Sequence, residues 1–196
     1  MNNLFKDNFG ARFHADLVSA PESAKTQVCF PGAIQGGWVE GLGVEFFPED
    51  GPPWYGSFAR GDLSRNAVNF AGSCPDKTSA LIVAKGEGYI VSSSDPKQWS
   101  ELPLRPVMGV IADAGEELIV VWDFVRMVCI DCHGVRWKTH SISWDGIKDV
   151  FIRNGEVHAN IWDAPNSCFN AARVNLDNGS VIGGSCPPLI EHHPMT

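Results

Sequence analysis

Two segments of this chain repeat one another at a distance of 40 residues, and this repeat constrains the fold more than any other feature. Gly115–Asp123 has the sequence GEELIVVWD and Gly155–Asp163 has GEVHANIWD, with every aligned residue offset by 40. A weaker copy, GEGYIV, begins at Gly86. A period of this length indicates a supersecondary unit that is built several times and packs on its neighbours. At about 40 residues per unit, a chain of 196 residues holds four or five.

The apolar residues alternate in short runs, which is the period of β-strands rather than of helices. Leu118, Val120 and Trp122 fall on one face of such a run, and the residues between them fall on the other. Turn signals separate the runs, at Asp145-Gly146, Asn154-Gly155 and Asn178-Gly179. These pairs favour hairpins because both central residues of a type I′ turn need a positive φ. The pattern predicts consecutive antiparallel hairpins from about residue 80 to 185.

The first part of the chain is less regular. Residues 36–47 favour a pair of strands, and residues 48–53, PEDGPP, favour an irregular loop. Residues 1–26 have no clear period, so a short helix and an extended arm both fit them. No linker divides the chain, and we expect a single β-rich domain over residues 1–196.

The repeated segments both end in Trp-Asp, and a third such pair stands at 144–145. Over residues 80–185 this pattern resembles the blades of WD-type β-propellers, which are four-stranded sheets arranged around an axis. The Gly-His dipeptide that opens such blades is missing, and His133-Gly134 has the reverse order. The region is also similar to bacterial β-rich proteins with a Trp-Asp-Gly hairpin, a likeness that implies no activity. The resemblance implies an all-β, propeller-like fold of four or five blades; a β-sandwich or barrel is the alternative.

Charge and composition narrow the classes of function. The formal net charge of −8 argues against a nucleic-acid partner, because neutralising phosphates needs a basic face. No apolar run approaches the length of a membrane span, and the first residues, MNNLFK, lack the apolar region of a secretory signal. We therefore expect a cytoplasmic protein without a membrane partner, whose six cysteines are reduced.

The segment CIDCH, from Cys129 to His133, matches the C-x-x-C-H site at which c-type haem is attached covalently. The same residues cross a predicted strand and its turn. A zinc site would need two further ligands, and no second C-x-x-C or H-x-x-x-H follows. We therefore expect Cys129 to be a small buried strand residue, His133 to lie at a turn, and no haem, metal or other cofactor to be bound here.

Two groups of residues are candidates for ligand binding. Arg136, Lys138 and His140 share one face of a predicted strand and could bind a carboxylate or a phosphate; the alternative is the solvated face of an antiparallel sheet. Trp54 and Tyr55 stand in a proline-flanked loop and could grip a sugar or a peptide. The alternative for this loop is packing over the edge of the core.

Common catalytic motifs are missing from the sequence: there is no P-loop, G-x-G-x-x-G, H-E-x-x-H or G-x-S-x-G. The aspartates of the Trp-Asp pairs (Asp123, Asp145 and Asp163) are expected to bind neighbouring turns. We favour a small β-rich binding or protein-interaction module, which acts through its loops on a protein or small molecule, over an enzyme. The alternative is a hydrolase or lyase that acts on a carbohydrate-like substrate through acidic residues. Two carboxylates, or a carboxylate and a histidine, that converge in one deep pocket would favour that alternative.

Trp122 and Trp162 occupy the same place in the repeat, so both are predicted to be structural anchors. Trp122→Ala is expected to lower the free energy of unfolding by about 3–5 kcal/mol. Trp54→Ala, in a binding loop, should leave stability unchanged. Thermal melts of the two variants compare them directly, and a Trp122 variant that melts like the parent while the Trp54 variant collapses would show that core and surface had been exchanged.

Overall fold

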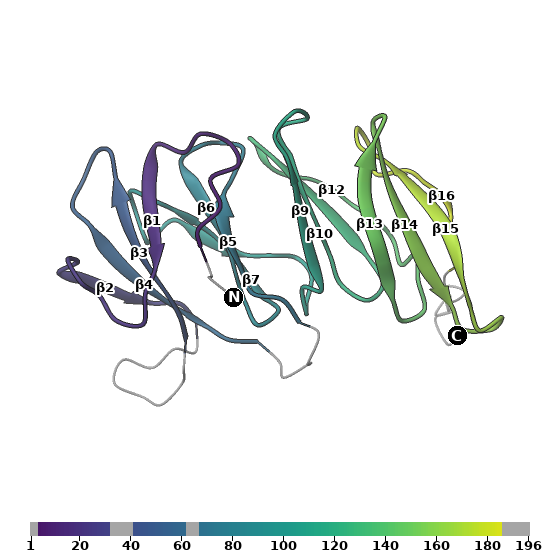
Figure 1. Cartoon of the computed structure of the whole chain (residues 1–196), viewed down its shortest axis with the longest axis horizontal. Coiled ribbons are helices and arrows are strands. Elements are labelled where there is room, and N and C mark those ends of the chain that lie inside the picture. Colours follow the sequence, from purple (N-terminus) through teal and green to yellow (C-terminus); the bar gives the residue numbers. More distant parts are fainter. Residues whose placement is uncertain (1–3, 32–40, 62–66, 186–196) are drawn as a thin grey trace, which may run out of the picture.

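A computed structural model describes residues 4–31, 41–61 and 67–185, and every regular element in these ranges is a β-strand. The strands form four separate four-stranded sheets, which stand side by side in chain order along the molecule (Figure 1). The all-β prediction is therefore confirmed, and the separate sheets correspond to blades rather than to a sandwich or a barrel. No helix capable of crossing a membrane occurs in the described ranges.

Sheets 2, 3 and 4 are antiparallel meanders in which each strand pairs with the next one along the chain. Sheet 2 contains β5 (Phe70–Ser73), β6 (Ser79–Ala84), β7 (Glu87–Ser92) and β8 (Trp99–Glu101). Sheet 3 contains β9 (Gly109–Asp113), β10 (Leu118–Trp122), β11 (Met127–Asp131) and β12 (Gly134–Lys138). Sheet 4 contains β13 (Ile147–Arg153), β14 (Glu156–Asp163), β15 (Cys168–Asn175) and β16 (Val181–Gly183). The hairpins predicted from residue 80 to 185 are confirmed.

Sheet 1 has a different strand order, β1-β3-β4-β2. It contains β1 (Phe13–Leu17), β2 (Thr26–Cys29), β3 (Gly41–Pro48) and β4 (Trp54–Ala59). The chain crosses from one edge of the sheet to the other before it forms β3, and β2 consequently pairs with β4 in parallel. The N-terminal segment thus contributes an extended strand, β1, which pairs with β3, and residues 4–26 form no helix. Residues 1–3, and residues 36–40 of the predicted strand pair, lie outside the described ranges.

The two-residue hairpin turns have the positive φ angles that such turns require, but the residues that form them are not always the predicted ones. Asn154 and Gly155 have φ values of 52° and 73°, as the predicted type I′ turn between β13 and β14 requires. Lys85 and Gly86 meet the same requirement between β6 and β7, with φ of 50° and 83°. Asp145-Gly146 does not form a hairpin turn, because it lies in the loop that leads from sheet 3 into β13.

The 40-residue repeat corresponds to two equivalent strands, as predicted. β10 and β14 are each the second strand of a four-stranded meander, paired on both sides. The weaker copy at Gly86 leads into β7, which is the third strand of sheet 2. That copy is therefore not an equivalent unit, and the stronger match alone reflects the architecture.

The aspartates at the ends of the two repeats bind turns. The Asp123 carboxylate accepts hydrogen bonds from the N–H groups of Val125 and Arg126 at 2.7 and 2.6 Å. The Asp163 carboxylate accepts from the side-chain amides of Asn166 and Asn170 at 2.8 and 2.9 Å. The bond from Asn166 contributes most to holding the pKa of Asp163 below its ordinary value. Both carboxylates thus hold local structure, as expected.

Three apolar cores fill the spaces between successive sheets. Sheets 1 and 2 meet through residues such as Val44, Phe46, Ala80 and Ile82. Sheets 2 and 3 meet through residues such as Leu81, Val83, Ile119 and Val121. Sheets 3 and 4 meet through residues such as Leu118, Val120, Val157 and Ile161. Alternate residues of one strand therefore face different neighbouring sheets, which explains why β6 and β10 are almost wholly apolar.

Trp54 is the first residue of β4 and lies in the first of these cores, so the structure favours the core-packing alternative for this residue over an exposed binding loop. Its side chain is only 3% exposed and stacks on Phe46, with ring centroids 4.3 Å apart. Its indole N–H donates to the carbonyl of Ser93 at 2.6 Å. Trp54→Ala is consequently expected to destabilise the fold by about 3–5 kcal/mol, contrary to the expectation from the sequence.

The outer face of sheet 1 is crossed by a segment of the chain itself. Val44 and Phe46 face sheet 2, so Glu45 between them points to the outer side. Glu45 is nevertheless only 1% exposed, because its carboxylate accepts hydrogen bonds from the N–H groups of residues 22–24 at 3.2, 2.7 and 2.5 Å. The connection between β1 and β2 therefore crosses this face and is held there by a buried carboxylate.

Glu45→Gln is expected to reduce the free energy of unfolding at neutral pH by about 1.5–3 kcal/mol, because an amide offers these N–H groups a single uncharged acceptor. Burial raises the pKa of Glu45, but the bonds from Ser23, Glu22 and Ala24 outweigh it and hold the pKa below its ordinary value. A lowered carboxyl pKa stabilises the fold above the unfolded-state pKa, and this contribution is lost as the pH falls through the folded-state value.

The difference between the parent and the Glu45 variant should therefore shrink at acidic pH. Denaturant titrations over a pH series measure it, with Glu49→Gln as the control, because Glu49 is an exposed residue of the next loop. A loss of the same size at every pH would contradict the proposed role of the ionised carboxylate.

Candidate functional site

Sheet 4 ends the row of sheets, at the right in Figure 1, and its outer face carries no other element of the described ranges. Val157, Ala159 and Ile161 of β14 face sheet 3. The alternate residues of β14, including His158 and Asn160, therefore point outward. This face exposes large apolar side chains: Phe151 is 48%, Phe169 is 41% and Ile182 is 59% exposed.

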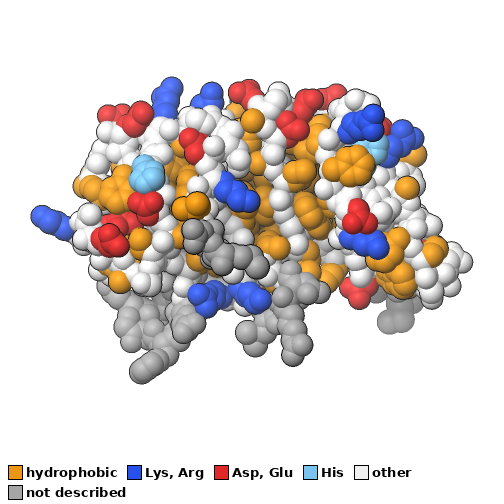
Figure 2. Space-filling model, viewed as in Figure 1, with side chains coloured by type: hydrophobic (Ala, Val, Ile, Leu, Met, Phe, Trp, Pro, Cys, Tyr) orange, Lys and Arg blue, Asp and Glu red, His pale blue; other side chains and the backbone are white. Residues whose placement is uncertain are grey.

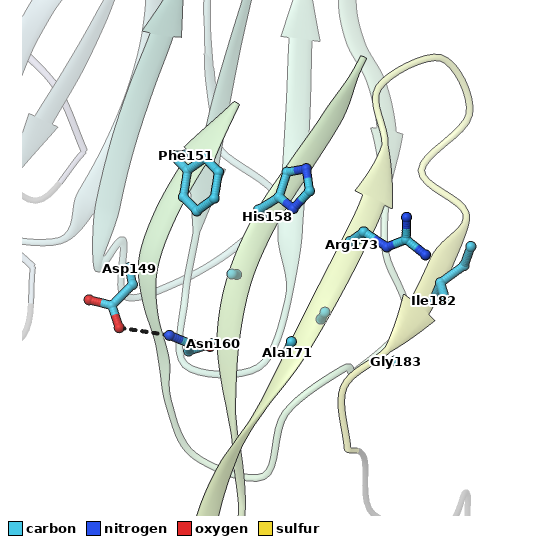
Figure 3. Close-up of a pocket in the computed structure, with 10 residues that line it drawn as sticks. Asp149, Phe151, His158, Asn160, Ala171, Arg173, Ile182 and Gly183 are labelled. Carbon is cyan, nitrogen blue, oxygen red and sulfur yellow. Dashed lines mark hydrogen bonds between the residues drawn. The ribbon is translucent and has the colours of Figure 1, made fainter. Parts of the chain in front are cut away.

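A groove of about 430 Å³ lies on this face (Figure 3). One side is a row of directly paired residues, one from each strand: Phe151, His158, Arg173 and Ile182. The next positions along β15 and β16 carry small residues, among them Ala171 and Gly183, and the face is hollow there. The volume falls within the range of about 300–1,000 Å³ that is usual for small-molecule pockets.

The row of four residues combines aromatic rings with charges. The rings of Phe151 and His158 are stacked, with centroids 4.9 Å apart and an interplanar angle of 6°. The Glu156 carboxylate accepts a hydrogen bond from Arg173 Nη1 at 3.4 Å, and His158 Nε2 lies 3.6 Å from the same oxygen. These contacts hold the imidazole and the guanidinium beside one another at the rim of the groove.

The opposite end of the face is aromatic as well. The Trp162 and Phe169 rings lie 5.0 Å apart at 57°, and Lys148 Nζ stands 3.7 Å from the centre of the Phe169 ring, a cation–π contact. The Asp149 carboxylate accepts a hydrogen bond from the Asn160 side chain at 2.9 Å. The face thus has apolar patches at both ends with charges of both signs between and beside them.

The repeat explains why this face differs from its counterpart in sheet 3. His158 and Asn160 are equivalent to Leu118 and Val120, which are almost completely buried beneath sheet 4. Two apolar positions have therefore become polar where no further sheet of the described ranges covers them. Trp162 is the tryptophan equivalent to Trp122 in the repeat, but it lies on the outer face of sheet 4 rather than in a core between sheets.

The three residues of the predicted basic stripe are exposed, and the residues between them are buried, so they share one side of the strand as predicted. Arg136 donates to the carbonyl and carboxylate of Asp177 at 3.3 and 3.1 Å, whereas Lys138 Nζ donates to the carbonyl of Pro103 at 2.5 Å. His140 is exposed and lies beyond the end of β12. The first two side chains are thus held by different neighbours, one in sheet 4 and one before β9. An anion site on this stripe stays a prediction, as does a binding role for Tyr55, whose pKa burial raises.

The C-x-x-C-H segment is a strand and its turn, as predicted. Cys129 lies in β11 and is buried, whereas Cys132 is exposed in the turn. Burial raises the pKa of the Cys129 thiol to about 12, against an opposing effect of Arg136. Within the ranges that the structure describes, no three His, Cys, Asp or Glu side chains are grouped so that they could hold a metal. Cys186 lies outside those ranges.

Two carboxylates do converge in a second hollow of about 410 Å³, between sheets 1 and 2. Glu87 and Glu101 both contact Arg105 Nη2, at 2.6 and 3.1 Å. Burial raises the pKa of Glu87, and Arg105 opposes this effect. Because the guanidinium stands between the two carboxylates, the group is an ion triad that ties β7, β8 and the following loop together. Both carboxylates of this hollow are paired with Arg105, so the hollow does not support the enzyme alternative.

The sequence matches no family model and none of the curated proteins with which it was compared. The residues of the groove were also not singled out by sequence reasoning. One signal in the sequence could have identified them: the second copy of the repeat has His158 and Asn160 where the first copy has Leu118 and Val120.

Alkylation of the folded protein at about pH 8 is expected to modify Cys132 and to leave Cys129 intact. The thiolate is the reactive form, and the Cys129 thiol is both inaccessible and protonated at that pH. Peptide mass spectrometry quantifies each site, with exposed Cys29 and buried Cys74 as internal controls. Equal modification of Cys129 and Cys132 before unfolding would contradict the assignment.

Proposed function

We propose that this protein is an interaction module and that the outer face of sheet 4 is its binding surface. The observation that carries the proposal is the contrast between two equivalent faces. The face of sheet 3 is buried beneath another sheet. The face of sheet 4 keeps Phe151, Phe169 and Ile182 exposed, and Phe151 and Ile182 line its groove. A clustered apolar surface with a polar surround is typical of a binding site.

The chemistry of the surface supports a protein partner. Interface centres are enriched in aromatic residues and arginine, and this face presents Phe151, Trp162, Phe169 and Arg173 on one sheet. The Trp-Asp hairpins of residues 80–185 support a relationship to WD-type propellers, which forms part of this proposal.

Ile182→Glu should weaken partner binding at least about tenfold, because the new charge must be desolvated when the face is covered. Val135→Glu is the matched control: Val135 is 50% exposed but lies on β12 of sheet 3. Partners are captured from an extract of the source cells with the parent, and their binding to the purified variants is then titrated. Binding that responds equally to both substitutions, or no binding at all, would refute the proposal.

A further inference from the structure

We infer that the partner binds this surface through an acidic segment, whose carboxylate lies between His158 and Arg173. Apolar side chains on either side of that carboxylate contact Phe151 and Ile182. The inference rests on the proposed function and adds the chemistry of the partner. Three features support it: the charge of the face, the surplus of cations around Glu156, and the order of side chains across the four strands.

The outer face of sheet 4 is basic on an acidic protein. Its charged side chains are three cations and two anions: Lys148, Arg153, Arg173, Asp149 and Glu156. The formal charge of this set is +1, and because the whole chain carries −8, the other residues together carry −9. At this end of the molecule Figure 2 shows basic side chains gathered beside a histidine and hydrophobic side chains. The face therefore attracts an anionic partner, whereas the rest of the protein repels one.

The cations concentrate around one carboxylate, that of Glu156. Arg153 stands directly opposite Glu156 on β13, and paired residues share one side of a sheet. Arg173 Nη1 and His158 Nε2 lie 3.4 and 3.6 Å from the same Glu156 oxygen. Within the described ranges, the ion pair with Glu156 is the only one that involves either arginine. Two permanent positive charges thus share a single carboxylate, and a carboxylate from the partner would balance the second.

Arg173 has both the donors and the space to bind such a carboxylate. Its side chain is 49% exposed, and a guanidinium has five N–H donors that bind carboxylates through two parallel hydrogen bonds. Beside it the groove is lined by the small residues Ala171 and Gly183 (Figure 3). A surplus of one positive charge matches a carboxylate, whereas a phosphate group carries about −1.5 to −2.

The order of side chains across the sheet sets the spacing of the acidic segment. The row of Phe151, His158, Arg173 and Ile182 takes one residue from each strand, with the two polar residues between the two apolar ones. Neighbouring strands are about 4.8 Å apart, so the first and last residues of the row are separated by roughly 14 Å. An extended chain rises about 3.4 Å per residue and turns every second side chain to one face, so its residues i and i+4 also span about 14 Å. A segment with an acidic residue at i+2 and apolar residues at i and i+4 therefore matches the row.

Random heptapeptides displayed on phage in several copies, which retain weak binders through avidity, are selected on the full chain and counter-selected on Ile182→Glu. The selected peptides should be enriched in Asp and Glu, with apolar residues two positions before and after the acid. The most enriched peptide is then synthesised together with a counterpart in which Gln or Asn replaces the acid. The acidic form should bind at least about tenfold more tightly than its counterpart, because a charged acceptor makes the stronger bond with a guanidinium.

Variants of the chain locate the carboxylate. Arg173→Gln should weaken binding of the acidic peptide at least about tenfold, and it should hardly change binding of the uncharged counterpart. This coupling between the two substitutions distinguishes a direct contact from a structural role. Arg12→Gln is the matched control, because Arg12 is an exposed arginine before β1, at the other end of the row of sheets. Circular dichroism and thermal melts establish that each variant is folded.

Three outcomes would overturn the inference: a selection that yields no peptide or no enrichment in acids, equal binding of the acidic and uncharged peptides, or equal effects of Arg173→Gln and Arg12→Gln. If a partner from the extract nevertheless binds in an Ile182-dependent manner, the inference fails and the proposed function stands. A face that selects no peptide and binds no such partner overturns both.

Discussion

The fold depends on strands that bury both of their faces. In β10, Leu118 and Val120 pack on sheet 4, while Ile119 and Val121 pack on sheet 2. Each fully buried Val, Leu or Ile contributes about 1.5–3 kcal/mol, so a sheet with two apolar faces is stable only between two neighbours. Each sheet with two apolar faces needs a neighbour on both sides. This need explains why the four sheets form a row with an apolar core between each successive pair.

A row of sheets has two outer faces, one at each end, and in this protein the two faces have different structures. At sheet 1 the chain crosses its own outer face, and the buried Glu45 carboxylate satisfies three backbone N–H groups of the crossing segment. At sheet 4 polar residues replace apolar ones at His158 and Asn160, but aromatic side chains remain beside them. Terminal repeats of stacked folds generally need a polar outer face for solubility. Sheet 4 meets this need in part, and the remaining apolar surface is where we place the binding site.

Buried polar groups in this protein hold turns and connections. Asp123 and Glu45 both accept hydrogen bonds from consecutive backbone N–H groups, and Glu87 is paired with Arg105. In the part of the chain that the structure describes, no buried side-chain nitrogen or oxygen lacks a hydrogen-bond partner. Such satisfied groups rigidify the loops between strands. They also explain why acidic residues recur at strand ends without forming a free pair of acids in the hollows described above.

The sequence by itself determined the all-β class, the consecutive hairpins after residue 80, the equivalence of β10 and β14 and the burial of Cys129. These features depend on an alternation of period two and on local turn chemistry, which neighbouring residues specify. Tertiary structure decided which faces are covered. Trp54 follows two prolines, as a loop residue would, but it is buried because Phe46 stacks on it and Ser93, 39 residues away, accepts its N–H. The neighbours that hold Arg136 and Lys138, and the sheet face that no other described element covers, also depend on the order of the sheets. Contacts between distant parts of the chain settle that order.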